Sequence, residues 1–127
     1  MSATVDVFVY GTLMAGEPQG GLLKRFPREE ASLSGRLYRL PQGYPALQLG
    51  GAAGERVYGE LVRQVDPRML PVLDQYEGVA EGLYRRVQVD VNAGLRAWPA
   101  WAWVMDDPLR RGGVHIPTGR WRGAIRR

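Results

Sequence analysis

Strand patterning is the feature that most constrains the fold of this chain. In short segments bounded by glycine and proline turns, apolar residues alternate with polar ones, which is the period of a β-strand with one buried face. In the clearest of these segments, Val87, Val89 and Val91 share one face. Six segments show the pattern: residues 5–10, 31–40, 44–49, 56–65, 83–92 and 96–105. The sequence therefore predicts an α+β fold, in which about six strands form a small mixed β-barrel with one or two short flanking helices.

Turn residues refine this arrangement. The turn at residues 92–94 joins the last two segments, so we expect them to form a hairpin. Pro99 lacks a backbone N–H, which predicts that its strand lies at an edge or contains a bulge. Residues 11–21 are rich in glycine and are typical of a loop, followed by a helical turn over residues 22–26. Because no linker divides the chain, we expect a single domain over residues 1–127.

Residue types exclude several kinds of site. The chain has no cysteine, which excludes disulfides, thiolate metal ligands and cysteine nucleophiles. His115 is the single histidine, and its glycine- and arginine-rich surroundings indicate a surface residue. A carboxylate must therefore carry any acid–base chemistry. The longest apolar run, residues 97–105, is interrupted by proline, whereas a membrane-spanning helix needs about 20 residues. The first strand also begins too close to Met1 for a secretion signal, so we expect a soluble, cytoplasmic protein.

Positive charge is concentrated at the C-terminus. Residues 1–109 carry 11 basic and 13 acidic side chains, a balance of −2, whereas residues 110–127 carry six arginines and no acid, a balance of +6. Such a tail is typical of a nucleic-acid-binding arm. The tail also contains Trp121 and Ile125, apolar residues that an electrostatic arm does not need. We therefore expect the tail to pack on the domain, and we do not expect nucleic acid or membrane partners.

A carboxylate at the end of the predicted main helix is the candidate acid–base group. Asp66 and Pro67 predict the start of this helix, and Gly78 predicts its end. Leu73 and Glu77 are four residues apart and share one helix side, which places Glu77 at the buried edge. Burial raises the pKa of a carboxylate, so Glu77 could exchange a proton near neutral pH. From position alone, a solvated Asp74–Glu77 pair on the helix surface is favoured, because charged residues usually lie on the exterior of helices.

Two stretches resemble the signatures of the gamma-glutamylcyclotransferase-like family. Tyr10-Gly11-Thr12-Leu13, where the first strand breaks at a glycine, is similar to the family's opening Tyr-Gly-Ser/Thr-Leu. The segment over residues 73–78 is similar to its Leu-Asp-x-aromatic-Glu. Further similar segments lie at residues 44–46, 57–61, 84–86 and 118–122, so that the resemblance as a whole extends over most of the chain.

The resemblance implies a barrel with a cavity at one end, between the first loop and the glutamate-bearing segment. It implies a γ-glutamyl amine or γ-glutamyl amino acid as the small-molecule substrate. The substrate's α-amine attacks its own γ-amide carbonyl, which closes 5-oxoproline and releases the amine, without a metal or cofactor. Glu77 would act first as the general base and then as the general acid. Backbone N–H groups of the first loop would hold a carboxylate or the oxyanion. The expected substrate-binding residues are Tyr10, Gly11, Thr12, Leu13, Tyr84 and Arg86.

Several alternatives stay open at this point. A non-catalytic domain of the same fold that binds a small anion is the main one. Glu60 is a rival carboxylate, and a Glu60–Glu77 pair in one cavity would formally allow glycoside hydrolysis. Arg120 departs from the family's closing aspartate, and Pro71 either kinks the helix or delays its start. The amine half of the substrate and the oligomeric state are not determined by the sequence.

Overall fold

The computed structural model describes residues 3–121, which form seven strands, one α-helix and one 3-10 helix. The elements follow one another in the order β1 (Val5–Val9), η1 (Gly20–Leu23), β2 (Arg28–Arg39), β3 (Pro45–Leu49), β4 (Arg56–Val65), α1 (Met69–Glu77), β5 (Arg85–Ala93), β6 (Arg96–Val104) and β7 (Val114–Ile116). All six predicted strands are present. The helical turn predicted for residues 22–26 is η1, which begins two residues earlier.

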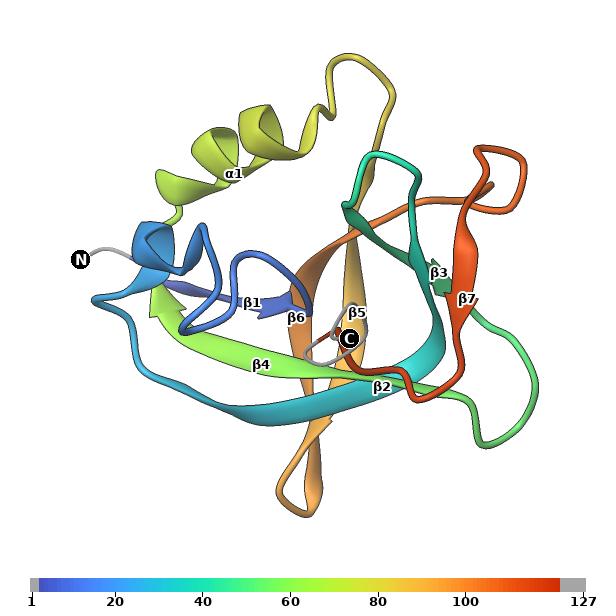
Figure 1. The fold of residues 1–127 in the computed structure, drawn as a ribbon. Coiled ribbons are helices and arrows are strands. Elements are labelled where there is room, and N and C mark those ends of the chain that lie inside the picture. The colour runs from blue at the N-terminus through green and yellow to red at the C-terminus, as the bar shows by residue number, and fades with distance from the viewer. Residues whose placement is uncertain (1–2, 122–127) are drawn as a thin grey trace.

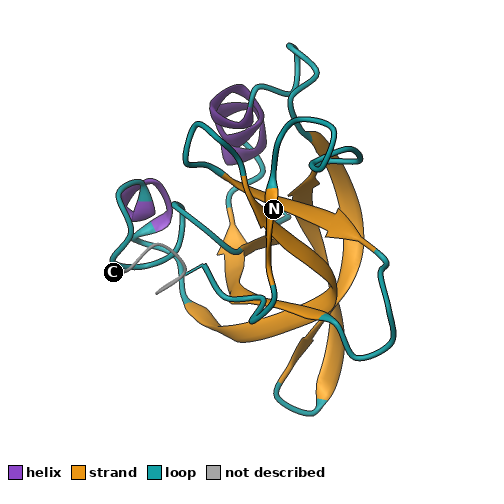
Figure 2. Cartoon of the chain, turned by 45° about the vertical axis from the view of Figure 1, so that its right-hand side comes forward, coloured by secondary structure: helices purple, strands orange, loops and turns teal. Residues whose placement is uncertain are grey.

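Five strands close into a barrel. Their order is β2-β4-β1-β6-β5, and a pairing between Ser32 of β2 and Asn92 of β5 joins the two ends (Figure 1). β1 and β6 run parallel, while the other neighbours in the barrel are antiparallel. The predicted small mixed barrel is therefore confirmed. In both views α1 lies above the strands (Figure 1, Figure 2).

The long strand β2 carries two further strands outside the barrel. Its first half pairs with β4. From Gly35 onward it pairs with β3 along one edge, and residues 37–39 also pair with β7 along the other edge. Gly35 lies where the partners change, and a Cβ there would lie 2.8 Å from the carbonyl oxygen of Gln48. A glycine is therefore needed for the close approach of β3. β7 was not predicted, because three residues are too few to show a period.

The predicted hairpin of β5 and β6 is confirmed, with nine paired positions from Arg85↔Val104 to Ala93↔Arg96. The prediction that Pro99 places its strand at an edge or at a bulge is wrong, since β6 lies between β5 and β1 and its register with β5 has no shift at Pro99. β6 pairs with β1 at Trp101, two residues beyond the proline. A proline is tolerated where its missing N–H has no ladder partner to serve.

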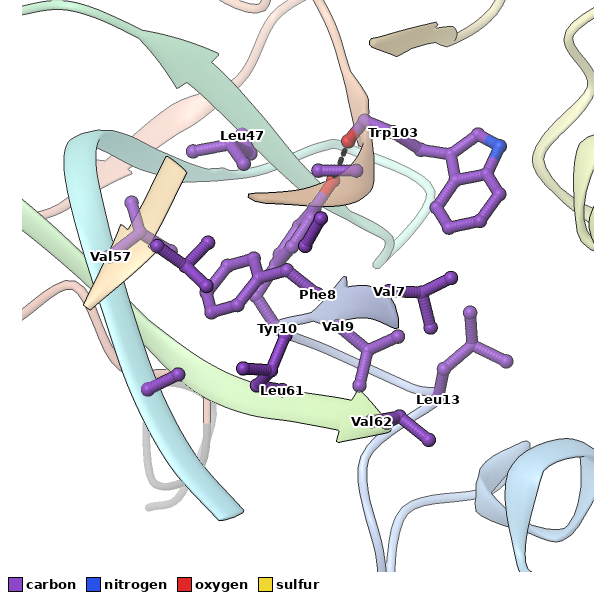
Figure 3. Close-up of a cluster of buried hydrophobic side chains, with 14 of the residues drawn as sticks. Val7, Phe8, Val9, Tyr10, Leu13, Leu47, Val57, Leu61, Val62 and Trp103 are labelled. Carbon is purple, nitrogen blue, oxygen red and sulfur yellow. Dashed lines mark hydrogen bonds between the residues drawn. The ribbon is translucent and has the colours of Figure 1, made fainter. Parts of the chain in front are cut away.

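β1 is buried on both faces and lies at the centre of the core. Phe8 extends toward Val57 and Tyr10 toward the backbone of Trp103, while Val7 and Val9 extend toward Val62 and Leu13 (Figure 3). Because side chains hold it from both sides, this strand positions the loop that follows it rigidly.

The helix α1 begins later than predicted. Asp66 does not cap it; its carboxylate accepts a hydrogen bond from the backbone N–H of Arg68 at 2.9 Å and pairs with the guanidinium of the same residue. The helix begins at Met69, so Pro71 is its third residue, where a backbone N–H has no acceptor within the helix. Pro71 therefore delays the start of the helix and does not kink it. No helix within residues 3–121 is long and apolar enough to cross a membrane.

The chain packs on the barrel as far as Trp121, which is buried. The backbone N–H of Tyr58 donates to the carbonyl of Gly119 at 2.8 Å, and the guanidinium of Arg120 lies 4.0 Å from the centre of the Tyr58 ring. The expectation of a packed tail is confirmed up to this point. Ile125 and the arginines at 122, 126 and 127 lie outside the described residues.

Candidate functional site

A cavity of about 210 Å³ opens between the end of β1 and the end of α1. Its walls come from the loop after β1, the turn before β3, the last turn of α1 and the segment before β5. Six of the seven residues proposed from the sequence line it: Tyr10, Gly11, Thr12, Leu13, Glu77 and Tyr84. Arg86 does not. The two sequence stretches, more than 60 residues apart, thus meet at one site.

Glu77 is the last residue of α1, and its position is fixed by two features of the helix. Leu73, one turn earlier, is fully buried and anchors the same side of the helix. Gly78 follows in the left-handed conformation, with φ 68°. Its N–H donates to the carbonyl of Gln75, while the N–H of Val79 donates to that of Asp74, as in a Schellman motif. The helix therefore ends abruptly and leaves the Glu77 side chain at the cavity.

Burial raises the pKa of Glu77 to about 7. Its position at the C-terminal end of α1 acts in the same direction, because the helix dipole disfavours a negative charge there. Two phenols line the same cavity, and burial followed by the charge of Glu77 raises the pKa of both Tyr10 and Tyr84 above their ordinary value. The site thus combines neutral phenols with a carboxyl that can hold or release a proton near pH 7.

Hydrogen bonds fix the hydroxyl groups of the cavity wall. Tyr10 donates its hydroxyl proton to the carbonyl of Trp103 at 2.7 Å (Figure 3). Tyr84 donates to the carbonyl of Pro45 at 2.5 Å. The hydroxyls of Thr12 and Tyr76 lie 2.8 Å apart and share a hydrogen bond, which links the first loop to the last turn of α1. Because Tyr10 and Tyr84 donate their protons to the protein, neither hydroxyl has a proton left to donate to a ligand.

The loop after β1 offers backbone donors to the cavity. Its shape is held by hydrogen bonds from the N–H of Met14 to the carbonyl of Gly11 and from the N–H of Gln19 to the carbonyl of Thr12. Within residues 3–121, the N–H groups of Gly11, Thr12 and Leu13 have no protein acceptor. Three neighbouring free donors at a cavity wall can hold an oxyanion or carboxylate.

The glycine at position 11 is required by tertiary packing. A Cβ on Gly11 would lie 2.3 Å from Cγ of Pro45, which lines the same cavity. The turn before β3 can therefore close the cavity only against a residue without a side chain. This packing role is separate from the binding of an anion by backbone N–H groups, which was expected of the same loop from the sequence.

Arg86 lies outside the cavity wall and stabilises the helix that carries Glu77. Its Nε donates to Oδ1 of Asp74 at 2.8 Å, and the same oxygen accepts a hydrogen bond from Nε1 of Trp103 at 2.9 Å. The guanidinium lies 4.7 Å from the centre of the Trp101 ring. Asp74 thus ties α1 to β5 and β6. The sequence reasoning missed this role, although Asp74 belongs to the motif that contains Glu77.

Sequence reasoning also missed part of the cavity wall, formed by Tyr44, Pro45, Tyr76 and Leu83. The similarity of residues 44–46 to a family segment was the available signal for the first two. Tyr76 directly precedes Glu77, and Leu83 would contact any Cβ on Gly78. Nothing in the sequence around these residues distinguishes them from apolar residues on an ordinary protein surface.

Glu60 does not share the cavity of Glu77, so the hypothesis of a carboxylate pair is wrong. It lines a separate hollow with Tyr58 and Arg120. Its carboxylate accepts hydrogen bonds from the N–H of Ala15 at 2.9 Å and from Arg28 at 3.1 Å. No group of three or more histidine, cysteine, aspartate or glutamate residues in the described part of the chain could hold a metal ion.

Comparison with known proteins identifies similar sequences. The family model described as "Gamma-glutamyl cyclotransferase, AIG2-like" matches residues 7–123. A curated relative, the gamma-glutamylaminecyclotransferase of Bos taurus, is 36% identical over 95 residues. This match covers 67% of the chain and 55% of the relative, so the chain spans about half the length of the curated relative.

Solved structures show the same fold. YkqA from Bacillus subtilis matches with a TM-score of 0.74 and 24% identity over 94% of this chain and 40% of its own. An AIG2-like protein from Mus musculus matches with a TM-score of 0.70 and 24% identity, covering 80% of this chain and 77% of its own. An uncharacterized protein from Pyrococcus horikoshii has a TM-score of 0.69 and 24% identity, with coverages of 93% and 90%.

Proposed function

We propose that this chain, which belongs to the gamma-glutamyl cyclotransferase, AIG2-like family, converts a γ-glutamyl amine or γ-glutamyl amino acid to 5-oxoproline and a free amine. The observation that carries the proposal is the carboxyl of Glu77, whose pKa burial raises to about 7. It lines one cavity together with the free backbone donors of the first loop.

Glu77 acts on both halves of the reaction. An α-amine is a nucleophile only when it is deprotonated, so the ionised carboxylate first accepts a proton from the substrate's α-ammonium group. The amine nitrogen then forms a bond to the γ-carbonyl carbon. The same carboxyl returns the proton to the leaving nitrogen as its bond to carbon breaks. The regenerated carboxylate then accepts the surplus proton of the ring nitrogen and passes it to the released amine, which leaves 5-oxoproline and the amine in its ammonium form. A group with a pKa near 7 is suited to both steps.

The first loop binds the negative charge. Backbone N–H groups of Gly11, Thr12 and Leu13 hold the substrate's α-carboxylate or the oxyanion that develops on the γ-carbonyl oxygen. A lone pair of the Tyr84 hydroxyl accepts a hydrogen bond from the α-ammonium group. Arg86 acts indirectly, as the partner that holds Asp74 and through it the helix of Glu77.

Release of 5-oxoproline from a panel of γ-glutamyl amines and γ-glutamyl amino acids tests the proposal. We expect turnover by the wild-type chain, loss of turnover in Glu77→Gln, and retained turnover in the matched control Glu81→Gln, an exposed glutamate in the turn after the helix. Unfolding curves must show that the Glu77→Gln variant is folded. Activity that survives in this variant would refute the role of Glu77.

The main alternative is a domain that binds a small anion without turnover. It predicts that γ-glutamyl compounds raise the melting temperature of the wild-type chain by mass action while no 5-oxoproline is released. That combination would replace the proposed activity with a binding function.

A further inference from the structure

The mouth of the Glu77 cavity is apolar. Tyr44, Tyr76 and Leu83 line the cavity and are also exposed, with 55%, 38% and 46% of their surface accessible. They are three of the eight large exposed apolar side chains among the described residues. Exposed apolar side chains gathered around one opening are typical of a ligand-binding surface.

The position of these side chains relative to Glu77 indicates which part of a substrate they meet. Tyr76 precedes Glu77 in the chain, and Leu83 packs against Gly78, which follows it. Because Glu77 must reach the leaving nitrogen, the group attached to that nitrogen begins beside Tyr76 and Leu83. At about 210 Å³ the cavity is smaller than the roughly 300 Å³ at which pockets for drug-sized ligands begin. The inner space therefore suits the glutamyl half, and the amine half lies at the mouth.

Charge distinguishes between kinds of amine. Among the described residues that line the cavity, Glu77 is the one ionisable as an acid or base near neutral pH, and no arginine or lysine is present. The arginines near this end of the barrel are already paired with carboxylates: Arg86 with Asp74, Arg85 with Asp106 and Arg111 with Asp107. A leaving amino acid would bring a second carboxylate close to Glu77 without a cation to receive it, which is unfavourable.

We propose that Tyr44, Tyr76 and Leu83 form a leaving-group subsite for uncharged aromatic or aliphatic amines, and that γ-glutamyl conjugates of such amines are the preferred substrates. The inference rests on the proposed cyclotransferase function and adds the character of the released amine. The bonds made and broken are those of the cyclisation itself. The apolar amine leaves with the proton that Glu77 returns to its nitrogen.

A neighbouring cleft provides the competing possibility. This cleft, of about 490 Å³, shares Leu83 and Tyr84 with the cavity and contains the Arg85–Asp106 and Arg111–Asp107 pairs. A long amine that ends in an ammonium and a carboxylate group could reach this cleft, but its charged groups would have to replace one partner in each of these ion pairs. The test therefore includes such a substrate.

Turnover of four conjugates provides the first measurement: γ-glutamylbenzylamide, γ-glutamylmethylamide, γ-glutamylglycine, and lysine carrying the γ-glutamyl group on its side-chain amine. We expect kcat/KM for the benzylamide to exceed that for the glycine and lysine conjugates about tenfold or more. Release of 5-oxoproline with the reverse preference would overturn the subsite while leaving the proposed function intact. A higher rate for the lysine conjugate would assign the amine half to the neighbouring cleft.

Binding to the Glu77→Gln variant separates the subsite from the chemistry. Calorimetric titration with γ-glutamylbenzylamide and γ-glutamylglycine measures affinity whether or not the wild-type chain releases 5-oxoproline. Absence of 5-oxoproline release would refute the proposed function but would leave the subsite to be judged from these affinities. We expect the benzylamide to bind about tenfold more tightly. Equal affinities, or no binding of the benzylamide, would overturn the subsite.

Substitution of the mouth provides the second measurement. In Tyr44→Ser, loss of the aromatic contact is expected to raise KM for the benzylamide about fivefold, and more than for the methylamide. The matched control is Leu95→Ser, which removes an exposed apolar side chain from the far hairpin turn between β5 and β6. An equal change in KM for both conjugates in Tyr44→Ser would contradict the role of Tyr44.

Discussion

Replacing Glu77 with glutamine is expected to stabilise the protein at alkaline pH, even though it removes the proposed catalytic group. The carboxylate is ionised there in a site that disfavours its charge. Glutamine has nearly the same shape and carries no charge. The variant therefore separates the cost of the charge from the contacts of the side chain.

The size and the sign of the effect follow from the raised pKa. The difference between the ordinary value of 4.5 and the value of about 7 in the folded protein corresponds to about 3 kcal/mol of unfolding free energy. Below pH 4.5 both states hold the proton, so Glu77 contributes no pH dependence. Between 4.5 and 7 the unfolded chain releases the proton while the folded chain keeps it, and stability falls as the pH rises. Above 7 the full penalty is present.

Urea unfolding of the wild-type chain, Glu77→Gln and the control Glu81→Gln at several pH values provides the measurement. We expect the Glu77→Gln variant to match the wild type near pH 4 and to exceed it by about 3 kcal/mol at about pH 8.5. Comparing the variants at each pH cancels the titration of all other groups. A difference that does not change with pH would refute the reasoning, because it would mean that Glu77 is solvated in the folded protein.

Three further predictions concern activity and packing. If Glu77 is the general base, kcat/KM for 5-oxoproline release should fall about tenfold for each pH unit below 7, and an acidic limb near 4.5 would contradict this. Gly59→Ala would place a Cβ 2.1 Å from the carbonyl oxygen of Val9, so we expect a loss of about 3 kcal/mol or more in urea unfolding, and a neutral result would argue against the close approach of β4 and β1. Asp74→Asn weakens the link to Arg86, so steady-state kinetics should show kcat reduced about tenfold with a smaller change in KM, whereas unchanged kcat would show that α1 holds its position without this pair.

Local patterns were sufficient to predict the strands and the side of the helix that bears Glu77. A period of two residues is a property of the strand itself, so all six segments were found, and β2 was misjudged only in its length. The spacing of Leu73 and Glu77 likewise fixes their common side on any helix. Leu73 is fully buried, as that spacing predicted.

Contacts between distant segments could not be predicted in this way. Arg86 was expected in the site, but Asp74 and Trp101 draw its guanidinium away from the cavity. The place of Glu60 depends on the register of β4 against β1, which the sequence does not reveal. Pro99 was misjudged because the neighbours of β6 depend on how the barrel closes.

The sequence by itself determined the parts of the site: a strand that breaks at Gly11, and a carboxylate on the inner side of a helix that Gly78 ends. The tertiary structure decided which carboxylate meets the loop and how strongly it is desolvated. It also decided that Gly11 faces Pro45 and that the hydroxyl of Tyr10 donates to Trp103. The physical reason is that periodicity and helix ends arise from neighbouring residues, whereas desolvation arises only when segments far apart in the chain exclude water together.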